Sequence, residues 1–384
     1  MKSLFFLLLI VFPSLLYSQN FKYESTDSLN AKPKNSIAFS GFVNSIYYYD
    51  FIGNASQYPA LNIVGVPVGN VLKEPSTTFV PFQTRMRFTS IHQSKIGEIK
   101  IYFEGDFVNS ANAFRLRHAL ISINKWDFGQ TWSNFADEDA WPNITDYDGP
   151  PTGVWARPTM IRYNAFRGRN HSVSVSIEGP SLDYQSHTVI DTMFTTAFQD
   201  VPDFTLRYRY VNDRVRIQIG GVLRSIKYKN IVDSTFSREM AYGVSVSTGI
   251  NAFGNDLLHA QATIGKGISR YLVGFEGQNW DAVPTGNGGI ELVPAVGGFV
   301  GYDHYWTKDK RFSSTLVVGY INIRNNLIFT PEDFMTGYWG AVNLYWHPVP
   351  EMDIAVEYVR AYREDTYGDS GYGARAQFMV MYHF

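Results

Sequence analysis

The chain has no cysteine among its 384 residues. This absence excludes disulfide bonds, thiol catalysis and thiolate metal sites. A surplus of charge is also missing, because 33 Lys and Arg face 35 Asp and Glu and leave a formal net charge of −2. A nucleic-acid partner usually demands a basic surface. We therefore expect no nucleic-acid partner.

Long apolar runs are equally scarce. The longest extends from Leu4 to Leu16, is almost wholly apolar and is interrupted at Pro13. It is shorter than the ~20 residues that a helix needs to cross a bilayer. It follows the positive Met1-Lys2 and precedes the small residue Ser18, a pattern typical of a cleaved signal peptide over residues 1–18. The absence of cysteine excludes a lipid anchor at the cleavage point, and an uncleaved anchor is the alternative.

Catalytic motifs are missing as well. The sequence contains neither Gly-x-Ser-x-Gly nor His-Glu-x-x-His, the local signatures of two hydrolase classes. Gly265-Lys-Gly267 lacks the remaining glycine of a dinucleotide fingerprint and lies in a strand pattern. We expect no enzyme and no cofactor, although a catalytic group assembled from distant residues has no motif.

The last residues of the chain show what is present instead: strict alternation. One face of the segment carries Phe378, Val380, Tyr382 and Phe384, and the other carries Gln377, Met379, Met381 and His383. Successive side chains of a strand point to opposite faces. A terminal strand with one aromatic face is typical of transmembrane β-barrels, and an edge strand of a soluble sheet is the alternative. Aromatic residues make up 16% of the chain, which suits a protein with two membrane interfaces.

The same period of two continues through most of the sequence. Residues 19–36 are polar and aperiodic and are predicted to form a flexible periplasmic lead-in. Residues 37–384 are predicted to form an all-β, antiparallel transmembrane barrel of about sixteen strands. The predicted strands are 37–49, 79–91, 98–107, 114–123, 126–132, 157–165, 171–179, 203–210, 215–227, 237–250, 256–266, 291–305, 311–323, 337–346, 352–362 and 372–384.

The connections between these segments alternate in length. Seven are short, such as Asn124-Lys125, and eight are longer, such as Asp50–Thr78 and Gly267–Ile290. Transmembrane barrels have an even number of strands, short periplasmic turns and longer outer loops. A soluble sandwich has no reason to segregate loop lengths in this way. The pattern predicts a protein of the outer membrane, in contact with its lipids.

Arginines at positions i and i+2 fix the inner face. An arginine at the hydrocarbon midplane on the lipid face of a barrel costs ~2–4 kcal/mol, so two per strand must point inward. We therefore expect a wet, charged interior that attracts anions; structural pairing of the arginines with wall acids is the alternative. The predicted pore-lining residues are Arg85, Arg87, Arg115, Arg117, Arg162, Arg207 and Arg209, with the acids Glu104 and Asp106; Arg360 and Arg375 are assigned to the same interior, and Arg214 and Arg216 to a turn rim.

A long loop over residues 133–156 is rich in aromatic and acidic residues. Loops of this length without regular structure are commonly functional. We expect this loop to fold into the barrel, narrow it and face the arginines with its acids. Calcium binding and a plain solvated loop are the alternatives, and no metal site is favoured. The predicted acids of this constriction loop are Asp137, Glu138, Asp139, Asp146 and Asp148.

Residues 37–165 contain an ordered set of short motifs: Phe39-Ser-Gly-Phe-Val43, Tyr102-Phe-Glu-Gly-Asp-Phe107, Phe114-Arg-Leu-Arg-His-Ala119, Gly129-Gln-Thr-Trp-Ser-Asn-Phe135, Gly149-Pro150 and Ile161-Arg-Tyr163. Together these motifs resemble the DcaP-type outer-membrane porins. The resemblance implies a sixteen-stranded trimer with an arginine-lined constriction and passive uptake of small anionic solutes such as dicarboxylates. It assigns the constriction to Arg85, Arg87, Arg115, Arg117 and Arg162. Some members have a long helical N-terminal segment, which the short lead-in of this chain does not match.

The sequence therefore favours a trimeric diffusion porin that prefers small anions. A channel for a neutral solute such as a sugar is the first alternative, with aromatic side chains of the interior as a stacking track. A non-transporting surface barrel that acts in adhesion or scaffolding is the second. Conductance and charge selectivity distinguish the three.

Overall fold

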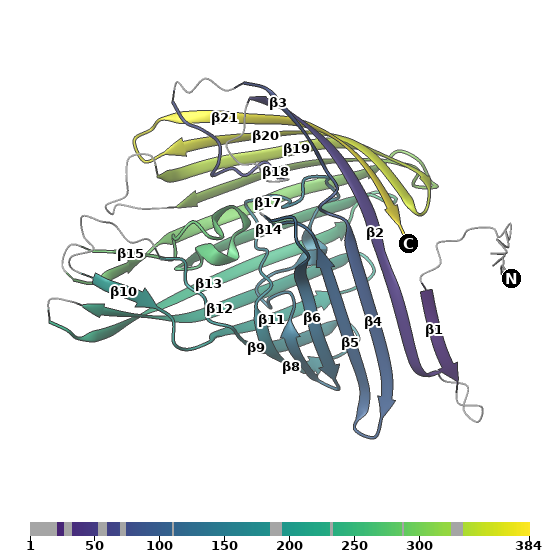
Figure 1. The fold of residues 1–384 in the computed structure, drawn as a ribbon, viewed down its shortest axis with the longest axis horizontal. Coiled ribbons are helices and arrows are strands. Elements are labelled where there is room, and N and C mark those ends of the chain that lie inside the picture. The colour runs from purple at the N-terminus through teal and green to yellow at the C-terminus, as the bar shows by residue number, and fades with distance from the viewer. Residues whose placement is uncertain are drawn as a thin grey trace, which may run out of the picture.

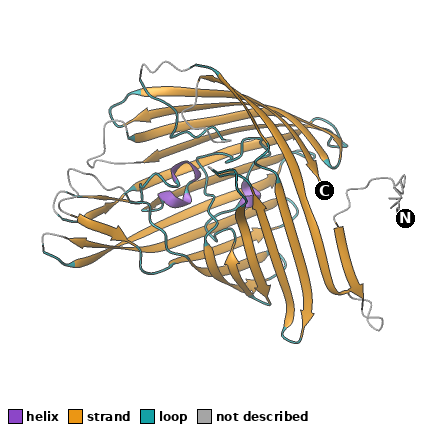
Figure 2. Cartoon of the chain, viewed as in Figure 1, coloured by secondary structure: helices purple, strands orange, loops and turns teal. Residues whose placement is uncertain are grey.

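The computed structural model describes residues 21–26, 33–52, 60–69, 74–109, 111–184, 194–230, 233–285, 288–323 and 333–384 (Figure 1). The predicted signal peptide, residues 1–18, lies outside this part. Nearly all regular structure in the described ranges is β-strand, and the helices are three single turns: η1 Glu138–Ala140, η2 Ser269–Tyr271 and η3 Val273–Phe275 (Figure 2). No helix of the described residues is long and apolar enough to cross a membrane.

Nineteen strands form one large sheet and two form a small one. The large sheet contains β1 Phe21–Thr26, β2 Pro33–Ile52, β3 Ser76–Val80, β4 Arg85–Ser94, β5 Gly97–Asp106, β6 Arg115–Ile123, β7 Trp126–Gln130, β8 Thr159–Arg167, β9 His171–Glu178, β10 Phe194–Phe198, β11 Asp203–Val211, β12 Val215–Asn230, β13 Phe236–Asn251, β14 Leu257–Lys266, β17 Pro294–Tyr305, β18 Phe312–Ile323, β19 Phe334–Val349, β20 Met352–Asp365 and β21 Ser370–His383. The small sheet pairs β15 Ala282–Pro284 with β16 Ile290–Leu292.

The large sheet closes into a barrel of sixteen antiparallel strands, as predicted. β2 pairs with β4 over its first half and with β21 over its second half, so the first and last wall strands meet. β3 and β4 both pair with β2 and form one interrupted wall strand, and β10 extends β11 along β12. β1 pairs with the start of β2. Closure through β2 and β21 joins the two edges of the wall, as a membrane-spanning sheet requires.

Strand boundaries differ from the prediction mainly near the N-terminus. β2 begins at Pro33 rather than residue 37, and Phe21–Thr26 of the predicted lead-in form β1. The predicted second strand, 79–91, is broken after Val80, where Pro81 offers no backbone N–H for the ladder. The segregation of short turns from long loops agrees with the prediction: within the described residues, the connection of β6 to β7 has two residues and that of β7 to β8 spans 131–158.

The barrel is closed at a seam that requires glycine. Gly41 and Phe384 exchange both backbone hydrogen bonds, at 2.9 and 3.0 Å. A Cβ at Gly41 would collide with the carbonyl oxygen of Arg85 on the neighbouring strand. Only a residue without a side chain lets the three backbones approach this closely.

We expect Gly41→Val to destabilise the barrel by about 1–3 kcal/mol, the usual cost of overpacking, or to block closure. The heat-dependent mobility of the folded barrel in gel electrophoresis, followed against temperature, measures this loss. Gly221→Val is the matched control, because a Cβ at Gly221 of β12 meets nothing within 4 Å. Equal stability of the two variants would contradict the assignment of the seam.

The outer face of the wall is apolar, as the alternation predicts. On β11, Phe204 and Leu206 are each 46% exposed, whereas Thr205 between them is fully buried. On β21, Phe378 and Tyr382 are each 44% exposed, whereas Gln377 and Met379 are buried. The exposed aromatic and aliphatic side chains give the wall the apolar outer face that is typical of transmembrane barrels.

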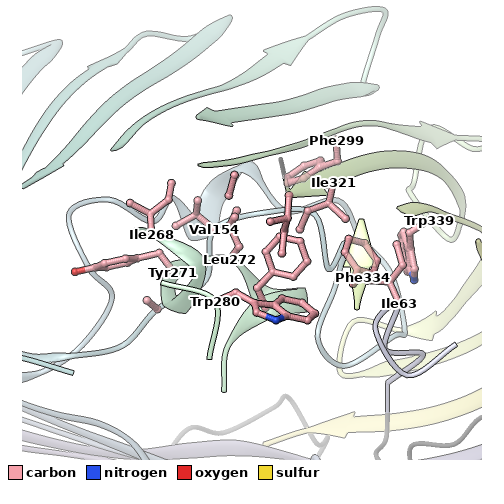
Figure 3. Packing of buried hydrophobic residues seen from close by; sticks show 14 of the residues in the cluster. Ile63, Val154, Ile268, Tyr271, Leu272, Trp280, Phe299, Ile321, Phe334 and Trp339 are labelled. Atoms are coloured by element: carbon pink, nitrogen blue, oxygen red, sulfur yellow. The ribbon is translucent and has the colours of Figure 1, made fainter. Parts of the chain in front are cut away.

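The interior is less uniformly polar than predicted. Three inward loops bury a hydrophobic core against the inner face of β17–β20, so the expectation of a wholly wet interior is wrong on this side (Figure 3). The loops contribute Leu61, Ile63 and Val66; Phe135, Ala136, Val154 and Ala156; and Ile268, Tyr271, Leu272, Phe275, Trp280, Val283 and Val293. The wall contributes Phe299, Val317, Ile321, Phe334, Trp339 and Val359, among others. Alternation alone cannot distinguish lipid from a loop core as the apolar neighbour of a strand.

Candidate functional site

The loop between β7 and β8, residues 131–158, runs around the inside of its own barrel. It touches the wall strands in succession. Near its start, Ser133 of the loop donates to Glu178 of β9, and Gln218 of β12 donates to the carbonyl of Ala136. Further along, Ser247 of β13 donates to Asp137, and Asn343 of β19 donates to the carbonyl of Asn143. Tyr147 then donates to Asp106 of β5. A loop that contacts both sides of the wall in this order lies within the lumen.

A buried carboxylate on the wall anchors the far side of this loop. Glu357 of β20 accepts the backbone N–H groups of Thr145 and Asp146 at 2.8 and 3.0 Å. Asn343 and Gln377 donate to the same carboxylate at 2.9 and 2.7 Å. Four donors on one carboxylate hold the loop at this point, because a buried charge is stable only when its hydrogen-bonding capacity is filled.

The predicted arginines of β4 and β6 gather around the two predicted acids of β5. Glu104 binds Arg87 at 2.6 Å, Arg117 at 2.9 Å and Arg85 at 3.4 Å. Asp106 binds Arg115 through both of its oxygens, each at 2.9 Å. Four guanidinium groups against two carboxylates leave a formal excess of two positive charges. We call these six residues the arginine wall.

A bulge explains a side chain that the alternation leaves on the wrong face. The pairing of β5 with β6 shifts register at Glu104/Gly105, which inserts one extra residue into β6. As a result Arg117 and His118, although adjacent, are both buried, at 2% and 4% exposure. His118 Nδ1 lies 3.0 Å from Thr131 Oγ1 at the start of the loop.

Tyr147 is the residue through which the loop meets the arginine wall. Its hydroxyl donates to Asp106 at 2.7 Å and accepts from Arg117 at 2.6 Å, and Arg115 also contacts it. The contact places the arginine wall inside the lumen, because the two preceding residues of the same loop, Thr145 and Asp146, are bound to Glu357 of β20. No local pattern in the sequence marks this tyrosine, because its contacts depend on where the loop runs inside the barrel.

The other predicted arginines form a second group on β8 and β11. Arg162 is buried and donates to the carbonyl of Trp132. Arg207 is half-buried, and no hydrogen bond or ion pair of its side chain occurs in the described part of the chain. Arg209 pairs with Asp139 and lies 3.6 Å from Asp137, and Arg216, predicted to be at a rim, lies 4.0 Å from Asp137.

The loop acids do not all face the arginine wall, which corrects the expectation of a single transverse field. Asp137 and Asp139 face Arg209 and Arg216 of β11 and β12, and Glu138 is exposed beside them. Asp146 points the other way and accepts the N–H of Leu61, and burial raises its pKa to about 8. Only Asp148 lies near Arg115 and Arg157. The acids have separate partners, and no group of three or more metal-binding side chains occurs among the described residues.

Arg157, at the end of the loop, is a functional candidate that sequence reasoning missed. Its guanidinium lies 4.6 Å from the centre of the Trp132 ring, and within the described ranges it has no ion pair. Burial, and then the positive charge of Arg117, lower the pKa of Arg157 to about 10. Arg157 therefore adds a further cation, from the loop, to those of the arginine wall. It stands alone between Ala156 and Pro158 and so lacks the i, i+2 spacing that marked the other arginines.

Two arginines assigned to the lumen have other roles. Arg375 is buried in a pair with Asp50, at 2.7 and 3.1 Å, and leaves no free charge. Arg360 is on the outer face of β20, since Val359 and Ala361 on either side of it are buried. The assignment of Arg360 to the interior is wrong, because the flanking residues set the face of β20 and a single arginine near a strand end can be accommodated at the interface.

The family comparison decides what kind of barrel this is. The family model described as DcaP outer membrane protein matches residues 12–384. The chain belongs to the DcaP outer membrane protein family. Its place is therefore the outer membrane, in agreement with the sequence-based expectation. No match to the chain is found among the curated proteins.

Solved structures share the fold of this DcaP-family chain. The outer membrane channel DcaP of Acinetobacter baumannii superposes with a TM-score of 0.79 at 21% identity, over 91% of this chain and 97% of that one. An anion-selective porin from Comamonas acidovorans gives 0.61 at 10% identity, over 91% and 100%. OmpT of Vibrio cholerae in its trimer form gives 0.56 at 10% identity, over 91% and 99%. At these identities the likeness is one of fold.

Proposed function

We propose that this DcaP-family barrel is a diffusion channel that passes small solutes and prefers anionic ones such as dicarboxylates. The observation that carries the proposal is the arginine wall, whose excess positive charge faces Tyr147 and Arg157 of the loop. Fixed cations inside a narrow passage raise the local potential and concentrate anions. The anion-selective function named for the Comamonas acidovorans porin supports this proposal.

The mechanism is electrostatic selection through weak, repeated contacts. Guanidinium groups bind carboxylates through paired donors. Arg157 and Arg207 have no ion pair among the described residues, so each offers its charge to a passing solute without first breaking an ion pair. The four arginines of the arginine wall already share Glu104 and Asp106, which weakens their hold on a solute. A solute that is attracted by these cations but held only weakly can both enter and leave the channel.

Assembly as a homotrimer is part of the proposal. The trimer form printed for Vibrio cholerae OmpT, a neighbour in fold, supports it. Three separate passages in one particle would open and close as independent units. Stepwise conductance in groups of three is the expected signature.

The neutral-solute alternative depends on the aromatic side chains of the loop. Trp132, Trp155, Trp141 and Phe299 follow one another with ring centres 4.0, 4.4 and 5.4 Å apart. These rings largely cover each other, and Phe299 and Trp132 are 3% and 8% exposed. A sugar needs open ring faces to stack on, so the geometry favours anions over a sugar. The non-transporting alternative has no such observation in its support.

Planar-bilayer recording of the purified protein tests the proposal. In a salt gradient we expect a reversal potential that favours anions, and conductance steps in threes. Competition by added succinate, a simple dicarboxylate, is expected to reduce the chloride current because both anions use the same cations. Cation selectivity would overturn the anion preference, and a complete absence of conductance would favour the scaffold alternative.

Asp148 is expected to make the anion preference depend on pH. Burial raises the pKa of Asp148 to about 6, although Arg115, Arg157 and Arg117 oppose the rise. Below this pH the carboxyl is neutral and the passage gains one unit of positive charge, so anion preference should strengthen as the pH falls from about 7.5 to about 5. The reversal potential measures this change. Asp148→Asn should remove it, and an unaltered pH profile in that variant would assign the titration to another group.

A further inference from the structure

The outer face of the barrel carries a row of tyrosines close to its long-loop end. Tyr320, Tyr338, Tyr362 and Tyr372 are successive register partners on β18, β19, β20 and β21. Their ring centres are 5.2, 5.9 and 5.2 Å apart. Tyr338 and Tyr372 are 53% and 46% exposed. A continuous row of outward tyrosines marks the level at which hydrocarbon meets the headgroups of a membrane.

Arg360 lies just inside this row, on the hydrocarbon side. It is two residues before Tyr362 on β20 and is the register partner of Ala374. Its guanidinium nevertheless lies 4.8 Å from the ring of Tyr372, which is two residues nearer the long loops than Ala374. The side chain therefore runs along the wall for roughly 7 Å toward the interface, as basic side chains do at membrane boundaries.

The charge of Arg360 is unmatched by protein. In the described part of the chain its side chain has no ion pair or hydrogen bond, and its contact is the face of Tyr372. An aromatic face attracts a cation but does not neutralise it. A guanidinium held at the headgroup level thus has free donors for an anion, and phosphate is the anion whose geometry it matches in pairs of hydrogen bonds.

An apolar groove continues from Arg360 toward the middle of the membrane. It has a volume of about 420 Å³ and is lined by Leu316, Val318 and Tyr358 besides Arg360. Leu316 and Val318 are 58% and 57% exposed. A cation at the interface above an apolar groove matches an amphiphile with an anionic headgroup and an acyl chain.

We propose that this groove, with Arg360 and the tyrosine row, binds a phosphorylated glycolipid of the outer leaflet, of the lipid A type. The phosphate binds the guanidinium of Arg360, an acyl chain lies in the groove, and the tyrosine row faces the sugar. Charge complementarity favours this occupant over a second copy of the chain, because the residues that line the groove with Arg360 are uncharged and offer a partner copy no acid in return. Glu364, on the loop side of the tyrosine row, already accepts the hydroxyl of Tyr362. The proposal is independent of the solute that the channel passes.

Native mass spectrometry of the full-length protein in mild detergent tests the proposal, with bisphosphorylated lipid A and the same lipid A after phosphatase treatment as probes. We expect Arg360→Gln to weaken binding of bisphosphorylated lipid A about tenfold, the effect of one lost charge-assisted contact. Removal of the phosphates should weaken binding to wild type equally and should cost the variant nothing further. Arg311→Gln is the matched control, since Arg311 is an exposed arginine at the short-turn end, paired with Asp309.

Several results would overturn the proposal. Equal binding of bisphosphorylated lipid A by wild type and Arg360→Gln is one, and equal binding of the dephosphorylated lipid by wild type is another. Loss of the oligomer in Arg360→Gln, without a change in lipid binding, would make Arg360 an interface residue between copies. Arg360→Lys, which keeps the charge, should retain most of the binding, and unchanged heat-dependent gel mobility shows that each variant is folded.

Discussion

Replacing both Arg85 and Arg87 with glutamate should reverse the charge preference of the channel. The two substitutions change the arginine wall from a formal excess of two positive charges to an excess of two negative charges, beside an unchanged loop. A change of this size should shift the ratio of anion to cation permeability by at least about tenfold, equivalent to ~1.4 kcal/mol. The reversal potential in a salt gradient measures the ratio directly.

Two other effects of this variant need controls: a loss of folding, and a change of charge at the mouth of the channel. Glu104 keeps Arg117 as a partner at 2.9 Å, so the double substitution does not strand it. Arg167 and Arg169 have the same i, i+2 spacing and are exposed at the short turn between β8 and β9, and their double replacement by glutamate is the matched control. If both double variants shift selectivity equally, the preference arises at the mouth rather than at the arginine wall.

The wall of the barrel was predictable because it depends on a local rule. Period-two alternation assigns faces residue by residue, and the cost of arginine in hydrocarbon fixes which face is inside. Arg85, Arg87, Arg115 and Arg117 followed from that rule and do meet around Glu104 and Asp106. The rule fails at the β6 bulge, where one inserted residue places His118 inside.

The interior was not predictable to the same degree, because it depends on contacts between segments far apart in sequence. The loop core joins Leu61, Val154 and Leu272 to the wall, and no local pattern records which loop lies over which strand. The same limit explains why Tyr147 and Arg157 were missed. Their roles arise from where residues 131–158 run inside the barrel, whereas their sequence neighbourhood carries only loop composition. Arg360 was wrongly assigned to the interior for the opposite reason. The local alternation of β20 places it on the outer face, and the assignment relied on its charge alone.

Arg224 offers the second large effect, because it joins the inner loops to the wall. It is completely buried on β12 and binds Asp203 at 3.2 Å and Asp281 at 2.9 Å, both also completely buried. Asp281 in turn accepts the N–H of Arg270 and the hydroxyl of Ser269 in the loop 267–293. Arg224→Met removes the cation bound to Asp281 and leaves Asp203 with Arg270, 3.4 Å away. Breaking a buried ion pair costs about 3–5 kcal/mol. We expect a matching loss of thermal stability, measured by unfolding in detergent.

The same variant should disturb conduction, although Arg224 does not touch the constriction loop. The loop 267–293 supports the constriction loop through the backbone bonds of Val273 to Gly153 at 3.0 Å, of Gly274 to Pro151 at 2.8 Å and of Trp155 to Tyr271 at 3.0 Å. Once its anchor is lost, both loops should fluctuate, and single-channel recordings should show larger current noise. Arg238→Met is the matched control, because Arg238 makes an exposed pair with Asp200 in the connection between β10 and β11.

A triple variant separates lost packing from stranded charge. In Arg224→Met with Asp203→Asn and Asp281→Asn, both buried carboxylates are neutralised, and Arg270, which loses Asp203, keeps the carbonyls of Ser181 and Gly179. Much of the lost stability should therefore return, as it does when buried ion networks are replaced as a unit. If stability returns while the current noise persists, the ion network holds the loops in position in addition to stabilising the fold. If the triple variant is as unstable as Arg224→Met, the hydrogen bonds of Arg224 to the carbonyls of Ser181 and Gly267 hold the loops, and the carboxylates are secondary.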